Sequence, residues 1–205
     1  MTMKYVVIGG SWGSLDPIIE IVSSLHPAID AAFLIVRHIS PNAPSLLPGI
    51  LQSHSALPVV DAEDGAKILA GTIHIAPAGM TTEVMRDSQG INRFRLGPIE
   101  PGQKPTPSIN DSLNSGAQLF DQDCIAVILS GYLDDGTEGA QTLASHHGFT
   151  IVQSPSDADA DSMPWNVIHR DSPDFILRAG QIGDILGELC RSPVSGDFAR
   201  VLQTG

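Results

Sequence analysis

A serine flanked by glycines is the first candidate for chemistry in this sequence. The segment reads Gly9-Gly10-Ser11-Trp12-Gly13, which fits the G-x-S-x-G pattern of a nucleophilic serine on a tight strand-to-helix turn. An apolar run, Tyr5 to Ile8, precedes it, and apolar residues at helical spacing follow it. The pattern alone also fits a glycine-rich turn whose serine caps a helix.

A histidine and two carboxylates follow two further apolar runs. His38 comes just after residues 31–36, and Asp134 and Asp135 come after residues 125–129. If these runs are parallel strands, their carboxyl ends meet at the edge of the sheet where ligands bind. That edge would then hold a nucleophile, a general base and a carboxylate to orient the imidazole. Each feature also has a structural interpretation, as a satisfied histidine at a strand end and as an Asp-Gly turn that caps a helix.

The same residues do not fit a nucleotide-phosphate loop or a metal site. The glycine spacing differs from G-x-G-x-x-G, there is no Walker lysine, and Arg37-His38 closes the second run where a dinucleotide fold has an acidic residue. Cys124 and Cys190 are the only cysteines and form no C-x-x-C pair, which disfavours a disulfide framework and a zinc site. We therefore expect no metal and no cofactor.

The composition indicates one acidic, globular domain. The chain has 205 residues, 42% of them hydrophobic, and a formal net charge of −12. This acidity argues against nucleic acid or an anionic membrane surface as a partner. Because no apolar run has the length of a signal peptide or a membrane span, we expect a cytoplasmic protein without membrane insertion.

Alternating strand and helix patterns predict the architecture. Strands are expected at 5–8, 31–36, 57–60, 125–129 and 149–152, and helices at 14–25, 41–53, 108–120, 136–147 and 182–189. This alternation predicts an α/β fold, a doubly wound, mostly parallel sheet with helices on both faces. Short runs at 72–76, 82–85 and 91–96 predict an antiparallel hairpin appendage. We expect one catalytic domain over 1–192 and a C-terminal tail over 193–205.

Together these segments resemble the chemotaxis protein-glutamate methylesterases, the CheB-type catalytic domain. The resemblance covers residues 5–190, nearly the whole chain, and its motifs keep the order of the family. It rests on Val6 to Ser14, Arg37 to Pro41, Gly71 to Pro77, Pro107 to Asn110 and Leu129 to Gly136, with Gln153 and Met163-Pro164 as later markers.

The resemblance implies a role for each candidate residue. Ser11 would be the nucleophile, His38 the general base and Asp135, the aspartate directly before the glycine, the orienting carboxylate. Backbone N–H groups near Trp12 and at Tyr132 or Leu133 would hold the oxyanion. The substrate side would include Thr106, Ser108, Asn110 and Met163.

The implied activity is hydrolysis of glutamyl methyl esters on methyl-accepting chemoreceptors, with deamidation of glutamines by the same acyl chemistry. We expect the domain to act without a receiver domain ahead of it. The sequence departs from the family at Trp12, at Tyr132-Leu133 in place of Met-Gly, at Thr106 in place of arginine and at Asn110 in place of aspartate. These departures leave open an alternative, a catalytically weak or inactive binding module in a signalling complex. A nucleotide-binding regulator of similar topology is a third reading.

Overall fold

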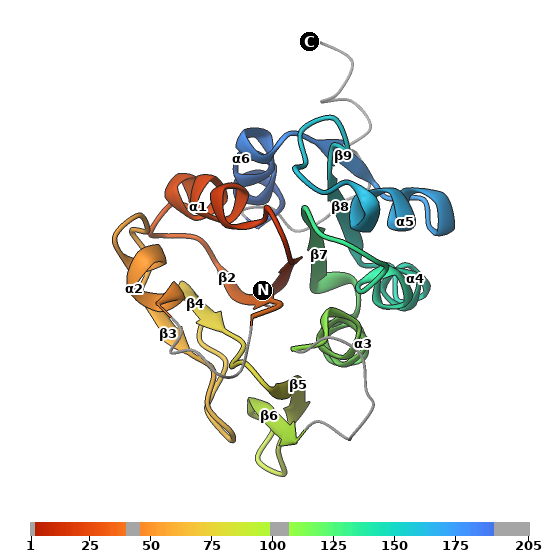
Figure 1. Ribbon diagram of the computed structural model, residues 1–205. Helices are drawn as coiled ribbons and strands as arrows, with labels where there is room; N and C mark the ends of the chain where they lie inside the picture. Colours follow the sequence, from red (N-terminus) through yellow and green to blue (C-terminus); the bar gives the residue numbers. More distant parts are fainter. Residues whose placement is uncertain (1–2, 40–45, 99–106, 191–205) are drawn as a thin grey trace.

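A seven-stranded parallel sheet forms the centre of the molecule (Figure 1). The structure is a computed structural model that describes residues 3–39, 46–98 and 107–190. Across the sheet the strands lie in the order β3-β4-β2-β1-β7-β8-β9. Their bounds are β1 Lys4–Gly10, β2 Ala31–Arg37, β3 Val59–Asp61, β4 Thr72–Ile75, β7 Cys124–Ile128, β8 Phe149–Gln153 and β9 Phe175–Leu177.

Helices cover both faces of this sheet, which confirms the predicted doubly wound α/β fold. One face carries α1 (Leu15–Ser24), α2 (Leu47–Gln52) and α6 (Ala179–Leu189), whose apolar residues share one core cluster. The other face carries α3 (Ile109–Phe120), α4 (Thr137–Ser145) and α5 (Ser162–Arg170), which contribute to a second cluster. In Figure 1, α1 and α6 lie together on the side of the sheet away from α3 and α4.

The central strands are apolar throughout because they are buried on both faces. Along β1, Val6 and Ile8 belong to the cluster beneath α1 and α6, while Tyr5 and Val7 belong to the cluster beneath α3 and α4. All seven residues of β1 are buried. The uninterrupted apolar runs of the sequence are therefore the signature of a sheet packed between two helical layers.

The hairpin prediction was right for two of its three runs. β5 (Met80–Arg86) and β6 (Asn92–Pro98) pair antiparallel and form a separate two-stranded sheet at the lower end of Figure 1. The run at 72–76, expected in a hairpin, is instead β4, which pairs in parallel with both β2 and β3. Ile73 and Ile75 face one core cluster, and His74, on the other face, packs on Phe94 of the hairpin. All four residues of β4 are buried, His74 included, so a polar residue in the pattern does not mark an exposed face here.

Other boundaries also differ from the sequence pattern. The helix predicted at 41–53 begins at Leu47 in the structure, and residues 40–45 lie outside the described part. Helix α5 and the short edge strand β9 were not predicted at all. Thr106 and the predicted tail at 193–205 also lie outside the described residues. Over 3–39, 46–98 and 107–190, no helix has both the length and the apolar character needed to cross a bilayer.

The chain reverses direction across the sheet between β1 and β7. From β1 it proceeds through β2 toward β3 and β4, and after the hairpin and α3 it returns to β7 on the other side of β1. The carboxyl ends of β1 and β7 therefore flank the topological switch point, where open α/β sheets bind their ligands. All three candidate catalytic residues follow strands that end at this point.

Candidate active site

Ser11 and His38 lie side by side because of the register between β1 and β2. Gly10 pairs with Arg37, and the backbone N–H of His38 donates to the Gly10 carbonyl at 3.2 Å. Ser11 directly follows β1 and His38 directly follows β2, so both residues lie at the carboxyl edge of the sheet. Among the described residues, the Ser11 hydroxyl makes no hydrogen bond to the imidazole. Such nucleophile–base bonds often tighten only when a substrate is bound.

The imidazole of His38 is held by Asp135. Its Nε2 atom lies 2.7 Å from Asp135 Oδ2, and both side chains are largely buried. An ionised carboxylate can only accept hydrogen bonds, so Nε2 is the protonated nitrogen in this arrangement. Nδ1 then carries the free lone pair and is the nitrogen available to take a proton from Ser11.

The Asp135 carboxylate is fixed by the first turn of α3. Oδ2 accepts a hydrogen bond from the backbone N–H of Ile109 at 2.8 Å, and Oδ1 accepts one from Asn110 at 3.1 Å. These donors are among the unpaired N–H groups that every helix N-terminus presents, and the helix dipole favours negative charge there. Asp135 therefore has three donors that suit the ionised form and hold it against His38.

Asn110 locks the turn that carries Asp135. Its Oδ1 accepts hydrogen bonds from the backbone N–H groups of Gly136 at 3.0 Å and Gly139 at 2.8 Å. The side chain thus caps the start of α4, while its own backbone N–H binds Asp135. This reciprocal link between α3 and α4 fixes the carboxylate in the sheet edge.

Ser130 holds the nucleophile turn in place. Its carbonyl accepts the N–H of Ser11 at 2.9 Å, and its hydroxyl donates to the carbonyl of Trp12 at 2.8 Å. The same hydroxyl accepts the N–H of Ala160 at 2.9 Å. The N–H of Ser130 itself donates to the buried side chain of Gln153 at 2.9 Å. These bonds join the ends of β1, β7 and β8 into one network.

Glycine is required where the two turns touch. Gly13 has φ of 75°, a conformation that L-residues with a side chain rarely adopt. At Gly131, a Cβ atom would lie 2.9 Å from the Cβ of Ser11 and would also collide with the sulfur of Met163. The backbone of residue 131 can therefore approach the nucleophile closely only because it has no side chain.

The N–H groups expected to hold the oxyanion lie in these turns. The N–H of Ser11 is already bonded to Ser130 and is not available. Within the described part of the chain, the N–H of Trp12 has no hydrogen-bond acceptor, and neither do those of Tyr132 and Leu133. Leu133, which stands where the family has a glycine, adopts φ of 69°, a left-handed backbone conformation that is unfavourable for a residue with a side chain. The backbone of this turn is therefore locally strained at Leu133.

The remaining predicted residues occupy different positions around the site. Ser108 caps α3 by accepting the N–H of Asp111 at 3.2 Å. Asn110 and Met163 are buried, the first in the α3–α4 link and the second against Gly131. Their contact with a substrate stays a prediction. The sequence indicated no separate role for Ser130, and Gln153 was only a marker of the family resemblance. A polar residue directly after a buried strand was the available signal for both.

The two carboxylates after β7 have different surroundings. Asp134 is partly exposed, and one of its oxygens lies 3.4 Å from a guanidinium nitrogen of Arg170. Asp135 is buried against His38 and α3. The geometry thus brings Asp135, and not Asp134, to the imidazole.

The fold and the site define a class of protein: a doubly wound α/β domain with a serine, a histidine and an aspartate gathered at the switch point of its sheet. The family model described as CheB methylesterase matches residues 6–186, and the chain belongs to this family. The fold agrees with the crystal structure of the Thermotoga maritima CheB methylesterase catalytic domain, with a TM-score of 0.88 and 30% identity. That match covers 92% of this chain and 100% of the other.

Curated relatives carry the name protein-glutamate methylesterase/protein-glutamine glutaminase. The protein from Thermotoga maritima is 31% identical over 91% of this chain and 54% of its own length. The second such protein of Methanosarcina mazei is 30% identical over 91% of this chain and 52% of its own length. The relative from Caldanaerobacter subterraneus is 34% identical over 88% of this chain and 50% of its own length. The chain thus spans about half the length of these curated relatives.

Proposed function

We propose that this protein is a serine hydrolase that cleaves glutamyl methyl esters on methyl-accepting chemoreceptors. The proposal also includes deamidation of receptor glutamines and a location in the cytoplasm. The observation that carries it is the His38–Asp135 pair, fixed by α3 and placed by strand register beside Ser11. Family membership and the names of the relatives support the choice of substrate.

In the proposed reaction, each of these residues has one step to perform. Ser11 Oγ attacks the ester carbonyl while Nδ1 of His38 takes its proton, and the new oxyanion is stabilised by the N–H of Trp12. His38 then gives the proton to the leaving methoxide, so methanol departs and an acyl-serine remains. Water, deprotonated by His38, attacks this ester and releases glutamate and free Ser11. With glutamine, the leaving group is ammonia.

Asp135 stays ionised throughout this cycle. It keeps His38 in the tautomer that leaves Nδ1 free, and it stabilises the imidazolium that forms after each proton transfer. Ser130 and Asn110 act on the same steps indirectly, since one positions Ser11 and Trp12 and the other positions Asp135.

The test is methanol release from a receptor-derived helical peptide that carries one glutamyl methyl ester. The proposal expects turnover by the wild-type protein and its loss in Ser11→Ala. Hydrolysis that survives in Ser11→Ala would refute the proposed nucleophile.

A binding module without catalysis is the second candidate, and one observation favours it. Leu133 holds a strained left-handed backbone in the turn expected to stabilise the oxyanion. The same peptide separates the candidates, because a binding module would bind it without releasing methanol.

A further inference from the structure

Large apolar side chains are exposed in the two turns next to the nucleophile. Trp12, Tyr132 and Leu133 are 66%, 56% and 64% exposed. They lie in two turns that touch, because Ser130 bonds the carbonyl of Trp12 and directly precedes Gly131 and Tyr132. We call these three residues the apolar rim. Aromatic residues exposed at one point on a soluble protein are typical of a surface that a partner covers.

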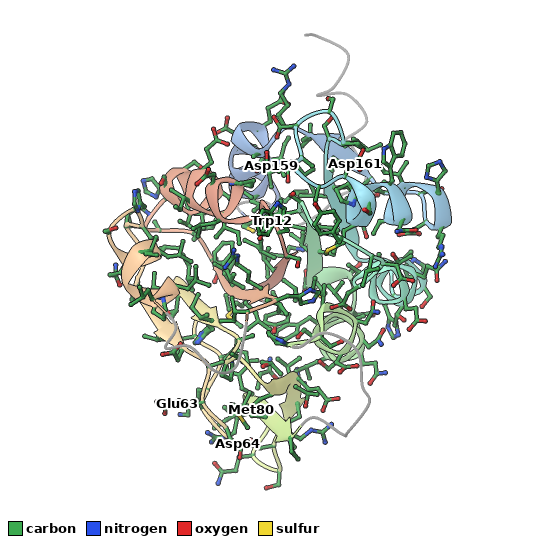
Figure 2. The ribbon with its side chains drawn as sticks, in the orientation of Figure 1. Trp12, Glu63, Asp64, Met80, Asp159 and Asp161 are labelled. Atoms are coloured by element: carbon green, nitrogen blue, oxygen red, sulfur yellow. The ribbon has the colours of Figure 1, made fainter. Side chains whose placement is uncertain are left out.

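Two exposed aspartates adjoin the apolar rim. Asp159 and Asp161 are exposed and flank Ala160. The N–H of Ala160 donates to the Ser130 hydroxyl, and its carbonyl accepts the N–H of Gly131, each at 2.9 Å. Asp159 also packs on the nucleophile turn. A Cβ atom added at Gly13 would lie only 2.5 Å from the Cβ atom of Asp159. Figure 2 shows Trp12 below Asp159 and Asp161. We call this pair the acidic rim.

Among the described residues, no salt bridge pairs Asp159 or Asp161 with a cation. The guanidinium of Arg170 lies against Asp134, at 3.4 Å. Arg37 is the last residue of β2 and directly precedes His38. The formal net charge of −12 adds to the negative field at the site.

From these contacts we infer that the protein selects substrate segments with an apolar residue and a lysine or arginine beside the modified glutamate, and discriminates against acidic ones. The inference rests on the proposed function and adds the chemistry of its substrate. A glutamyl ester that reaches Ser11 from a helix brings the residues three and four positions away over the two rims. An apolar residue there covers Trp12 or Leu133, and a basic one meets Asp159 or Asp161.

The experiment uses four helical peptides of about 20 residues, a length that supports helix formation. Each carries one glutamyl methyl ester, with Leu or Ser four residues away and Lys or Glu three residues away. Binding is measured by fluorescence anisotropy with Ser11→Ala, and methanol release is measured with the wild-type protein. We expect the Lys peptides to bind roughly tenfold more tightly than the Glu peptides at low salt, from two exposed charge contacts. Leu should improve binding about fivefold over Ser.

The variant Asp159→Asn/Asp161→Asn should bring the Lys and Glu peptides within about twofold of each other. Its control is Glu63→Gln/Asp184→Asn, which removes the same charge elsewhere. Asp184 lines a pocket with Ser24 at the far end of α1, and Figure 2 shows Glu63 well away from Trp12. The control should keep the tenfold preference. Added salt should weaken binding of the Lys peptides and strengthen binding of the Glu peptides.

The outcomes separate this inference from the proposed function. Hydrolysis of all four peptides at equal rates would overturn the inference and leave the hydrolase intact. Selective binding without methanol release would overturn the hydrolase and uphold the inference. Equal losses in the two double variants would mean that net charge, and not the acidic rim, sets the preference. Failure of every peptide to bind Ser11→Ala would also overturn the inference.

Discussion

Replacing Asp135 by asparagine removes the charge that serves His38 while keeping nearly the same shape. In the structure the carboxylate accepts from His38 Nε2 at 2.7 Å and from the backbone N–H groups of Ile109 and Asn110 at 2.8 and 3.1 Å. An amide has one acceptor oxygen, so its NH₂ group must face one of these donors. At least one buried hydrogen bond is lost, together with the stabilisation of the imidazolium.

The expected cost follows from these losses. Turnover should fall on the order of 10²- to 10⁴-fold, which corresponds to about 3–5 kcal/mol in the activation barrier. Stability should fall by roughly 1–3 kcal/mol because a buried, charge-assisted bond is replaced by a donor facing a donor. The fold should survive, since Asn110 still caps α4 through Gly136 and Gly139.

Asp134→Asn is the matched control. Asp134 precedes Asp135 directly, is partly exposed and contacts Arg170 at 3.4 Å, so its loss should cost less than tenfold in turnover. The assay is methanol release from a glutamyl methyl ester peptide, with unfolding by urea as a check on stability. If Asp134→Asn were the more damaging substitution, the assignment of the carboxylate and of the oxyanion turn would both be wrong.

Three further predictions test other parts of the structure. Ser11→Ala and His38→Ala should each lose about 10⁴-fold in turnover, and the double variant should be scarcely worse, whereas additive losses would show that the two do not act as a unit. Burial lowers the pKa of His74 to about 4 from its usual 6.5, so the folded state disfavours the proton that the unfolded chain binds. The stability this gives is complete above pH 6.5 and is lost between pH 6.5 and 4, on the order of 3 kcal/mol. Urea unfolding across that window should show a steeper loss for wild type than for His74→Leu, and parallel curves would contradict it. Leu133→Gly should stabilise the protein by about 0.5–1 kcal/mol, seen as a higher urea midpoint, because glycine accepts the positive φ without strain. An unchanged or lower midpoint would mean that the turn is not strained.

The positions of the candidate site residues were predictable where each depends on the strand that the residue follows. Ser11, His38 and Asp135 each come after a buried run, and parallel strands bring their carboxyl ends to one edge. The helical layers followed from apolar residues at helical spacing. The position of β1 between β2 and β7, which creates the switch point, comes from the structure and was not predicted.

Features that depend on backbone register were not predictable in this way. In the structure, Nε2 of His38 faces Asp135, and Asn110 accepts two N–H groups at the start of α4. Both contacts depend on how α3 and α4 pack together, which no local sequence pattern encodes. The network at Ser130 depends on the positions of the Trp12 and Ser130 carbonyls and of the Gln153 side chain, which lie at the ends of β1, β7 and β8. β4 was misplaced because four residues containing a histidine carry too little periodicity to distinguish a buried strand from a hairpin.

The central claim is that Ser11 is a nucleophile activated by His38. A fluorophosphonate that reacts with activated serines tests this without knowledge of the substrate. After labelling, mass spectrometry should find one adduct, on Ser11, and the adduct should be absent in Ser11→Ala and much slower to form in His38→Ala. Labelling of another residue, or none at all on a folded protein, would contradict the account.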